Sequence, residues 1–246
     1  MNVTFFLNKR VLGTIICTIL GLFAHGAGFG ADERGGADLI YSFSYLEDTE
    51  GQYQVDEVGE LAFTSLETSQ PNFGLTSSVY WLKVHFENRS LDSIFWFNVQ
   101  NPSITDIRFF SADSDNFSEQ QINIHTLIRE RPMNSHYPLF KIIQAPGTQA
   151  VYFVRVESKN VLELPLSIVK EKVIVGQLSL DHLLFGLYAG MILVMFFYNF
   201  FLFVTVRDVQ YLYYVLYILV IGLTQACLKG FAVKYLWGGN TWLSDN

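Results

Sequence analysis

Apolar and polar residues alternate with a period of two along much of the segment from Asp32 to Val175. The alternation is clearest in Tyr80–Phe86, Phe95–Val99 and Leu162–Ile168, where every second side chain is apolar. This pattern is typical of β-strands that bury one face against a core. Each of these three segments is therefore predicted to be a strand of a sheet with one covered side.

Turn-forming sequences separate the alternating segments. They are rich in Pro, Gly, Asn and Ser and occur at Pro71–Gly74, Asn88–Ser90, Asn101–Pro102, Ser111–Ser118 and Pro146–Gly147. Short strands joined by frequent turns, with no strong amphipathic helix between them, indicate two antiparallel sheets packed face to face. We expect an all-β sandwich over residues 32–178.

The pattern changes abruptly after Asp181. Leu183–Val206 contains no charged residue, Arg207–Gln210 interrupts the apolar run, and Tyr211–Leu228 continues without charge. As α-helices these runs would be about 36 and 27 Å long, close to the hydrocarbon thickness of a bilayer, about 30 Å. Residues 183–206 and 211–228 are therefore predicted to be transmembrane helices in contact with the lipid bilayer.

The N-terminus has the features of an export signal. Two basic residues precede the apolar run Val11–Ala24, and small residues follow it up to a cleavage point after Gly26. Residues 1–26 are predicted to be a signal peptide, with an uncleaved anchor as the alternative. Export places the sandwich in the periplasm and the chain, as a multi-pass protein, in the bacterial inner (cytoplasmic) membrane. Residues 229–246 would then begin a truncated periplasmic loop.

Composition narrows the classes of function. The 246 residues are 50% hydrophobic and 16% charged, with a net charge of −7. Residues 27–181 hold 21 Asp and Glu against 11 Lys and Arg, so an acidic surface excludes nucleic acid as a partner. The two cysteines, Cys17 and Cys227, lie in apolar runs, which excludes a disulfide framework and a thiolate metal site. No cofactor is expected.

Several short motifs in this order resemble a known family. In the first part of the chain they are Trp81–Asn88, Trp96, Asn101–Pro102, Arg131–Pro132, Pro138–Phe140 and Tyr152–Ser158. In the apolar part they are Phe185–Gly190, Tyr198–Asn199, Arg207–Asp208, Tyr211–Tyr214 and Tyr235–Trp237. Together they resemble the second extracellular sensor type, and the first two helices, of the bacterial seven-transmembrane receptors with diverse intracellular signalling modules.

The resemblance implies a fold and a function. It implies a jelly-roll-like periplasmic sandwich, related in shape to carbohydrate-binding modules, which precedes seven helices and a cytoplasmic kinase, cyclase or phosphatase. This sequence stops after the second helix, so we expect a fragment of a receptor without an effector domain and without enzymatic activity of its own. An adaptor that binds a periplasmic protein is the alternative, and a hydrolase is a more remote one.

A small, carbohydrate-like ligand would need aromatic faces and hydrogen-bonding side chains. Trp81 and Trp96 fall on the outward phase of their strands, and Asn98 and Gln100 share the phase of Trp96. These residues are candidates for a polar-aromatic platform. The alternative for either tryptophan, and the one that the pattern favours, is structural packing near a sheet edge or under a loop. Arg155 lies between apolar neighbours and is expected to meet a ligand carboxylate or an internal acid, such as the nearby Glu157.

Metal binding and catalysis have little support in the sequence. Asp113–Asn116 imitates the start of a calcium loop, but the later Gly and Glu of such a loop are replaced by Ser118 and Ile124. The histidines have no metal-ligand spacing, and no nucleophile elbow, zinc-protease helix or phosphate loop is present. No metal site is expected.

Four residues of the apolar runs are candidates for helix packing. Gly186 and Gly190, four positions apart, would let a second backbone approach closely. Asn199 and Gln225 are amides that need partners inside a bilayer, and they are expected at different depths. Their partners would lie on other helices or on a second copy of the chain, as in a homodimer.

Overall fold

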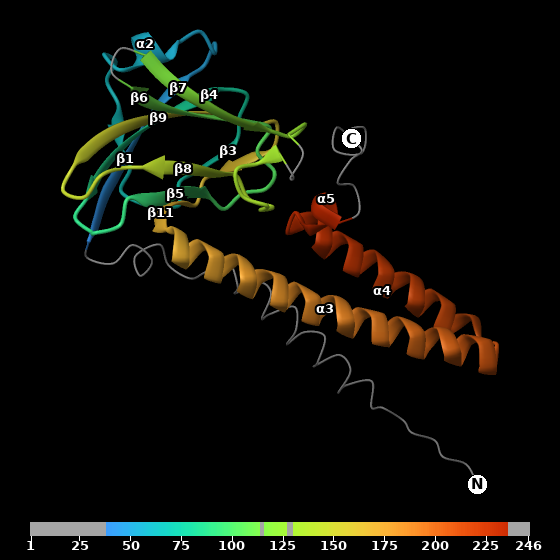
Figure 1. Cartoon of the computed structure of the whole chain (residues 1–246). Coiled ribbons are helices and arrows are strands. Elements are labelled where there is room, and N and C mark those ends of the chain that lie inside the picture. The colour runs from blue at the N-terminus through green and yellow to red at the C-terminus, as the bar shows by residue number, and fades with distance from the viewer. Residues whose placement is uncertain (1–37, 114–115, 127–129, 236–246) are drawn as a thin grey trace.

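A computed structural model describes residues 38–113, 116–126 and 130–235 of the chain. The expected signal peptide, residues 1–26, and most of the expected loop 229–246 lie outside these ranges. Figure 1 shows a β-sandwich joined to a hairpin of two long helices. The all-β, jelly-roll-like sandwich followed by membrane-type helices that the sequence predicts is therefore confirmed.

The larger layer is an antiparallel sheet of six strands in the order β2-β1-β4-β9-β6-β7. Its strands are β1 (Leu39–Asp48), β2 (Thr64–Ser65), β4 (Val79–Asn88), β6 (Asp106–Asp113), β7 (Asn116–Asn123) and β9 (Gln149–Glu157). Neighbouring strands are often distant in the sequence, as in a sandwich whose strands cross between layers. One short helix, α2 (Val55–Val58), lies in the connection from β1 to β2.

The second layer consists of two smaller antiparallel sheets. One has the order β11-β5-β8 and the other the order β10-β3. The strands are β3 (Asn72–Leu75), β5 (Ile94–Val99), β8 (Leu139–Ile143), β10 (Val161–Glu163) and β11 (Leu166–Lys170). Figure 1 shows β5, β8 and β11 beneath the larger sheet.

Aromatic side chains from both layers fill the space between the sheets. Phe109 of β6 stacks on Phe140 of β8 and on Tyr152 of β9, with ring centroids 5.5 and 5.2 Å apart. Phe97 of β5 joins the same group, 5.6 Å from Phe109. The inward residues of the alternating segments supply this core, as their period of two predicts.

The segment Leu162–Ile168 forms two strands rather than the single strand predicted. The break falls at Leu164–Pro165, and Pro165 has no N–H to donate to a ladder. β10 pairs with β3, whereas β11 pairs with β5. Leu162, Leu164, Leu166 and Ile168 are nevertheless all buried in the core, so the alternation predicts their burial although it misses the change of sheet.

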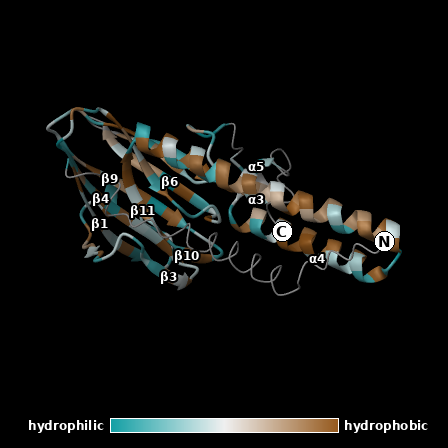
Figure 2. Ribbon diagram, turned by 90° about the horizontal axis from the view of Figure 1, so that it is seen from below, coloured by the Kyte–Doolittle hydropathy of each residue, from teal (hydrophilic) through white to brown (hydrophobic). Residues whose placement is uncertain are grey.

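Two long helices follow the sandwich. α3 (Glu171–Val206) begins directly after β11, and α4 (Val209–Leu228) runs back beside it to the short helix α5 (Phe231–Tyr235). Arg207, in the left-handed conformation, ends α3, and the carboxylate of Asp208 accepts a hydrogen bond from the backbone N–H of Gln210 to begin α4. Both helices are long and apolar enough to cross a membrane, and they are mostly brown in Figure 2.

α3 starts twelve positions before Leu183 and is about 54 Å long at 1.5 Å per residue. A bilayer core of about 30 Å cannot contain that length. The first turns of α3 therefore project toward the sandwich, where Ile174 and Leu178 are buried against it.

Candidate ligand-binding site

The outer face of the sheet β11-β5-β8 carries three polar side chains in adjacent positions. Trp96 and Asn98 are two residues apart on β5 and so share this face. Ser167 of β11 and Leu139 of β8 are the register partners of Asn98 on its two sides. The alternation of β5 therefore brings an indole, an amide and a hydroxyl together.

This face is covered by two segments from elsewhere in the chain. Ile174 and Leu178 of α3 form one buried cluster with Trp96, and Met133 and Tyr137 from the segment 130–138 pack against this cluster. Trp96 is 4% exposed and Asn98 is fully buried. The site is thus enclosed between the sandwich and the beginning of α3, rather than being the open platform that the sequence suggests.

The polar atoms of this face have no hydrogen-bond partner among the described residues. They are Trp96 Nε1, both amide atoms of Asn98, and Ser167 Oγ. Each buried polar group left without a partner costs about 1–3 kcal/mol of folding stability. Most buried polar groups in proteins are paired, so several unpaired groups in one place require an explanation.

The segment 130–138 adds two basic side chains. Arg131 donates from Nη1 to the carbonyl oxygens of Ser135 and His136, at 3.2 and 3.4 Å. Its Nε has no acceptor among the described residues, and neither ring nitrogen of the buried His136 has a partner there. Burial lowers the pKa of Arg131.

His136 is held neutral. Burial, together with the positive charges of His182, Lys234, Arg131 and Lys229, lowers the pKa of His136 to about 3. At neutral pH its ring therefore has one nitrogen that donates and one that accepts. A ligand could use both.

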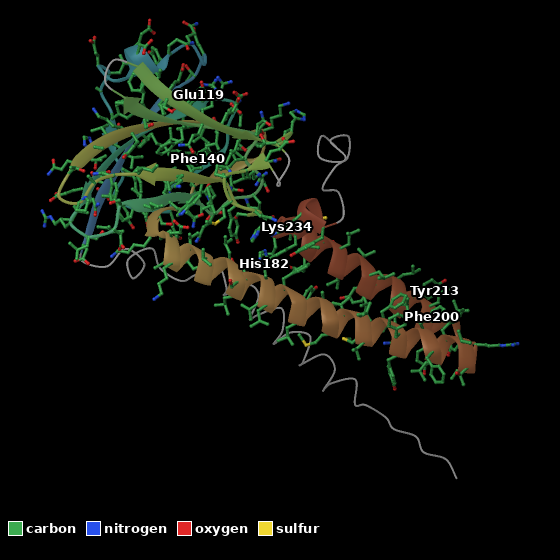
Figure 3. All side chains as sticks on the ribbon, viewed as in Figure 1. Glu119, Phe140, His182, Phe200, Tyr213 and Lys234 are labelled. Carbon is green, nitrogen blue, oxygen red and sulfur yellow. The ribbon has the colours of Figure 1, made fainter. Side chains whose placement is uncertain are left out.

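The membrane hairpin contacts the same segment through α5. Lys234 Nζ donates to the carbonyl oxygen of Asn134 at 3.0 Å and lies 2.9 Å from His182 Nε2. Figure 3 shows Lys234 and His182 together between α5 and α3. Phe231 stacks on Phe185 of α3 and contacts the His136 ring, with centroid distances of 4.0 and 4.5 Å. The segment that covers the site is therefore also the contact between sandwich and helices.

The remaining ligand candidates lie apart from this site. Trp81 and its register partner Arg155 lie on the outer face of the six-stranded sheet, on the opposite side of the sandwich. Trp81 is 1% exposed and stacks on Phe110 beneath the covering residue Val58. The expected exposed platform on β4 is therefore not formed, because the connection from β1 to β2 folds over it.

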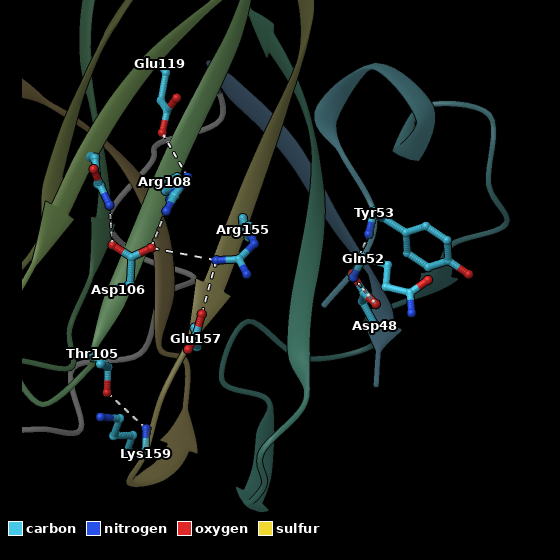
Figure 4. A network of polar contacts seen from close by, with 11 residues as sticks. Asp48, Gln52, Tyr53, Thr105, Asp106, Arg108, Glu119, Arg155, Glu157 and Lys159 are labelled. Carbon is cyan, nitrogen blue, oxygen red and sulfur yellow. Dashed lines mark hydrogen bonds and ion pairs between the residues drawn. The ribbon is translucent and has the colours of Figure 1, made fainter. Parts of the chain in front are cut away.

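Arg155 forms ion pairs within the protein. Of its two expected partners, a ligand carboxylate or an internal acid, the structure shows the internal acid. Arg155 Nη1 lies 3.2 Å from Glu157 and 3.7 Å from Asp106. Asp106 in turn pairs with Arg108, which also contacts Glu119. Figure 4 shows this network on the surface of β6, β7 and β9, and, apart from it, the Asp48 carboxylate accepting the N–H groups of Gln52 and Tyr53.

Gln100 follows Val99, the last residue of β5, and is half-buried there. Its backbone N–H donates to the carbonyl oxygen of Pro165 at 3.0 Å. Of the five ligand candidates, the structure thus brings Trp96 and Asn98 together on one face, and Gln100 follows at the end of their strand.

The candidates for helix packing occupy different environments. Gly186 and Gly190 have no neighbour within 4 Å of an added Cβ, so α4 does not pack on them. The close approach of α3 and α4 is instead at Gly222, whose added Cβ would lie 3.2 Å from Ile192. Asn199 is buried and donates to the carbonyl oxygen of Met195 in its own helix at 2.8 Å. Gln225 is half-buried on α4.

The described residues contain no group of His, Cys, Asp and Glu that could hold a metal ion. The calcium-like turn Asp113–Asn116 lies partly outside those residues.

Sequence reasoning missed Arg131, His136 and Ser167 as members of the site. Arg131 and His136 lie in an irregular segment, where no periodicity indicates which way a side chain points. The only signal was that Arg131–Pro132 is one of the motifs of the family resemblance. Ser167 could have been found by alternation, since it follows Leu166 in a strand whose even-numbered residues are buried in the core.

A sandwich that passes directly into two long apolar helices has the architecture of a membrane protein with a folded domain outside the bilayer. Residues 41–170 match the family described as 7TMR-DISM extracellular 2, and residues 181–246 match 7TM diverse intracellular signalling. The chain belongs to this family of seven-transmembrane receptors, with the sandwich as its sensory extracellular domain. The first matched region is the extracellular sensor domain, and the second belongs to the membrane domain.

Two solved structures are similar to part of the chain. TmCBM61, solved in complex with β-1,4-galactotriose, is 10% identical and has a TM-score of 0.26, with 58% of this chain and 94% of that one covered. CBM32-1 from a family 31 glycoside hydrolase of Clostridium perfringens is 13% identical with a TM-score of 0.24, covering 56% and 97%. No match was found among curated proteins.

Proposed function

We propose that the sandwich binds a small, carbohydrate-like molecule at the outer face of β11-β5-β8 and signals its presence through α3. The observation that carries this proposal is the side chain of Asn98, which is fully buried while neither amide atom has a partner among the described residues. Beside it, the indole N–H of Trp96 and the hydroxyl of Ser167 are equally unpaired. A sugar has hydroxyls that donate and accept, and so it could pair with all three.

The route from site to membrane is short. β11 carries Ser167 and continues into α3 without a connecting loop. Ile174 and Leu178 of α3 pack on Trp96, so a ligand that moves the indole would displace the first turns of the helix. The ligand can shift the receptor between two states only by the difference in its affinity for them.

In this proposal the chain spans the bacterial inner membrane with the sandwich in the periplasm. The turn at Arg207 and Asp208 would face the cytoplasm, and Gly186 and Gly190 would pack against further helices or a second copy of the chain. The open surface at these two glycines supports this arrangement.

The proposal is tested with the full chain in mild detergent, titrated with neutral mono- and disaccharides while tryptophan fluorescence is recorded. A saturable change is expected in the wild type and is expected to be lost in Asn98→Ala. The matched control is Asn160→Ala, at an exposed asparagine whose side chain donates to the carbonyl oxygen of Ser103, and it should bind as the wild type does. Silence across a broad panel of sugars, or a stoichiometric protein that co-purifies and replaces them, would overturn the proposal in favour of the adaptor.

A further inference from the structure

Arg131 differs from the other arginines described in the sandwich. Arg89, Arg108 and Arg155 each form an ion pair with a carboxylate. Arg131 forms none with any described carboxylate, although burial lowers its pKa, and its Nε has no acceptor. A buried guanidinium is normally paired, because its desolvation is costly.

The side chains around Arg131 are basic, although the His136 ring is neutral at neutral pH. His136, Lys234 and His182 gather where the segment 130–138 meets α3 and α5. Glu130, the residue that precedes Arg131, is exposed, and Asp181, which precedes His182, makes a contact of its own; no ion pair joins either of them to Arg131. The sandwich is acidic as a whole, so the positive charges of Arg131 and Lys234 differ from the prevailing charge around them.

We infer that the ligand carries an anionic group, a carboxylate or a phosphate, that accepts a hydrogen bond from Arg131 Nε. The inference rests on the proposed function and narrows its ligand from sugars in general to small hydroxylated anions, such as an acidic sugar. Guanidinium groups match the geometry of carboxylate and phosphate oxygens, and the charge strengthens the bond. The hydroxyls of the same molecule would remain for Asn98, Ser167 and Trp96.

Because Arg131 lies in the segment 130–138, an anion bound to it would also affect the order of that segment. Arg131 Nη1 binds the carbonyl oxygens of Ser135 and His136, and Lys234 binds the carbonyl oxygen of Asn134 in the same segment. An anion on the guanidinium would therefore order a segment that α5 already contacts. The ligand would act on the helix hairpin from two sides, through Trp96 and through the segment 130–138.

The test compares two probes of the same shape, D-glucuronate and D-glucose, by thermal unfolding and tryptophan fluorescence of the full chain in detergent. The wild type is expected to bind glucuronate at least about tenfold more tightly than glucose, a preference that added salt reduces. Arg131→Gln should abolish the preference, and Arg131→Lys should retain part of it. Arg108→Gln, which removes an arginine from the outer network, is the matched control and should keep the preference.

The possible outcomes distinguish a failure of the anionic-group inference from a failure of the proposed ligand site. Equal binding of both probes, unchanged by Arg131→Gln, would overturn the anionic group while the proposed function stands. Binding of neither these probes nor a wider panel of neutral and acidic sugars would overturn both. A third arm uses nanodiscs of phosphatidylcholine with or without phosphatidylglycerol. Stabilisation by phosphatidylglycerol that needs Arg131 would support the anion site and identify a lipid headgroup as its source.

Discussion

Lys234 of α5 donates a hydrogen bond to the carbonyl oxygen of Asn134, one hundred positions earlier in the chain, at 3.0 Å. This bond joins the end of the helix hairpin to the segment that covers Trp96. It is a direct polar link between the extracellular domain and the membrane part. If the segment 130–138 becomes more or less ordered, this hydrogen bond to α5 is expected to change with it.

Replacing Lys234 by Met keeps most of the aliphatic stem and removes the donor. We expect the amides of residues 130–138 to exchange hydrogen several-fold faster, since a hydrogen bond of this kind contributes about 1 kcal/mol. Hydrogen exchange followed by mass spectrometry measures the effect. Lys229→Met, at a lysine for which no side-chain hydrogen bond to the segment is seen, is the control. Equal exchange in both variants would mean that the bond does not hold the segment.

Two buried asparagines provide a comparison of paired and unpaired amides. Asn98 has no partner for either amide atom. Asn88, also fully buried, donates to the carbonyl oxygens of Asp92 and Gln144 and accepts from the N–H and the hydroxyl of Ser90. Asn98→Leu is expected to stabilise the ligand-free protein by about 1–3 kcal/mol, because it removes an unpaired polar group.

Asn88→Leu is expected to do the opposite and destabilise the protein by a similar amount or more, because it leaves several backbone and side-chain partners unpaired. Thermal unfolding in detergent, with sugar titrations on each variant, measures both. A stabilised Asn98→Leu that no longer binds ligand is the signature of a residue kept for function. If Asn98→Leu destabilises as strongly as Asn88→Leu, the amide has a structural role and the site lies elsewhere.

Alternation along β5 is enough to predict that Trp96 and Asn98 share the outer face of a sheet, because successive side chains point to opposite sides. It does not predict what covers that face. The run without charged residues begins after Asp181, so the sequence predicts a helix that starts at Leu183. In the structure α3 starts at Glu171, and Ile174 and Leu178, four positions apart on one helix face, belong to the same buried cluster as Trp96. This cover depends on contacts between distant segments, which local patterns do not encode.

The pKa of His136 has a consequence for stability. Its value in the folded protein, about 3, is lower than the 6.5 of a free histidine. Between these values the unfolded chain binds a proton that the folded chain does not, so stability is complete above pH 6.5 and is lost as the pH falls. The loss is about 1.4 kcal/mol for each pH unit, or roughly 2 kcal/mol between pH 6.5 and 5.

Thermal unfolding at pH 7.5, 6.5 and 5 measures this dependence. In His136→Phe the contribution should vanish and the curve should flatten over this range. His85→Phe, at an exposed histidine on β4, is the control and should keep the wild-type slope. A slope that is the same in all three proteins would show that His136 takes up its proton in the folded state as easily as in the unfolded one.

Gly230 connects α4 to α5 with a positive φ of 74°, and a Cβ at this position would lie 2.9 Å from Pro102 Cβ and 3.4 Å from His136 Cβ. Gly230→Ala should therefore destabilise the contact between α5 and the sandwich by about 1–3 kcal/mol, through backbone strain and the clash. Gly176→Ala is the matched control, because that residue lies in the exposed first part of α3 with nothing within 4 Å. There the same substitution should stabilise the helix by up to about 1 kcal/mol.

Thermal unfolding together with hydrogen exchange of residues 130–138 distinguishes the two substitutions. Faster exchange in Gly230→Ala alone would show that the docking of α5 orders the segment over Trp96, whereas unchanged exchange in both would leave that segment independent of the helices.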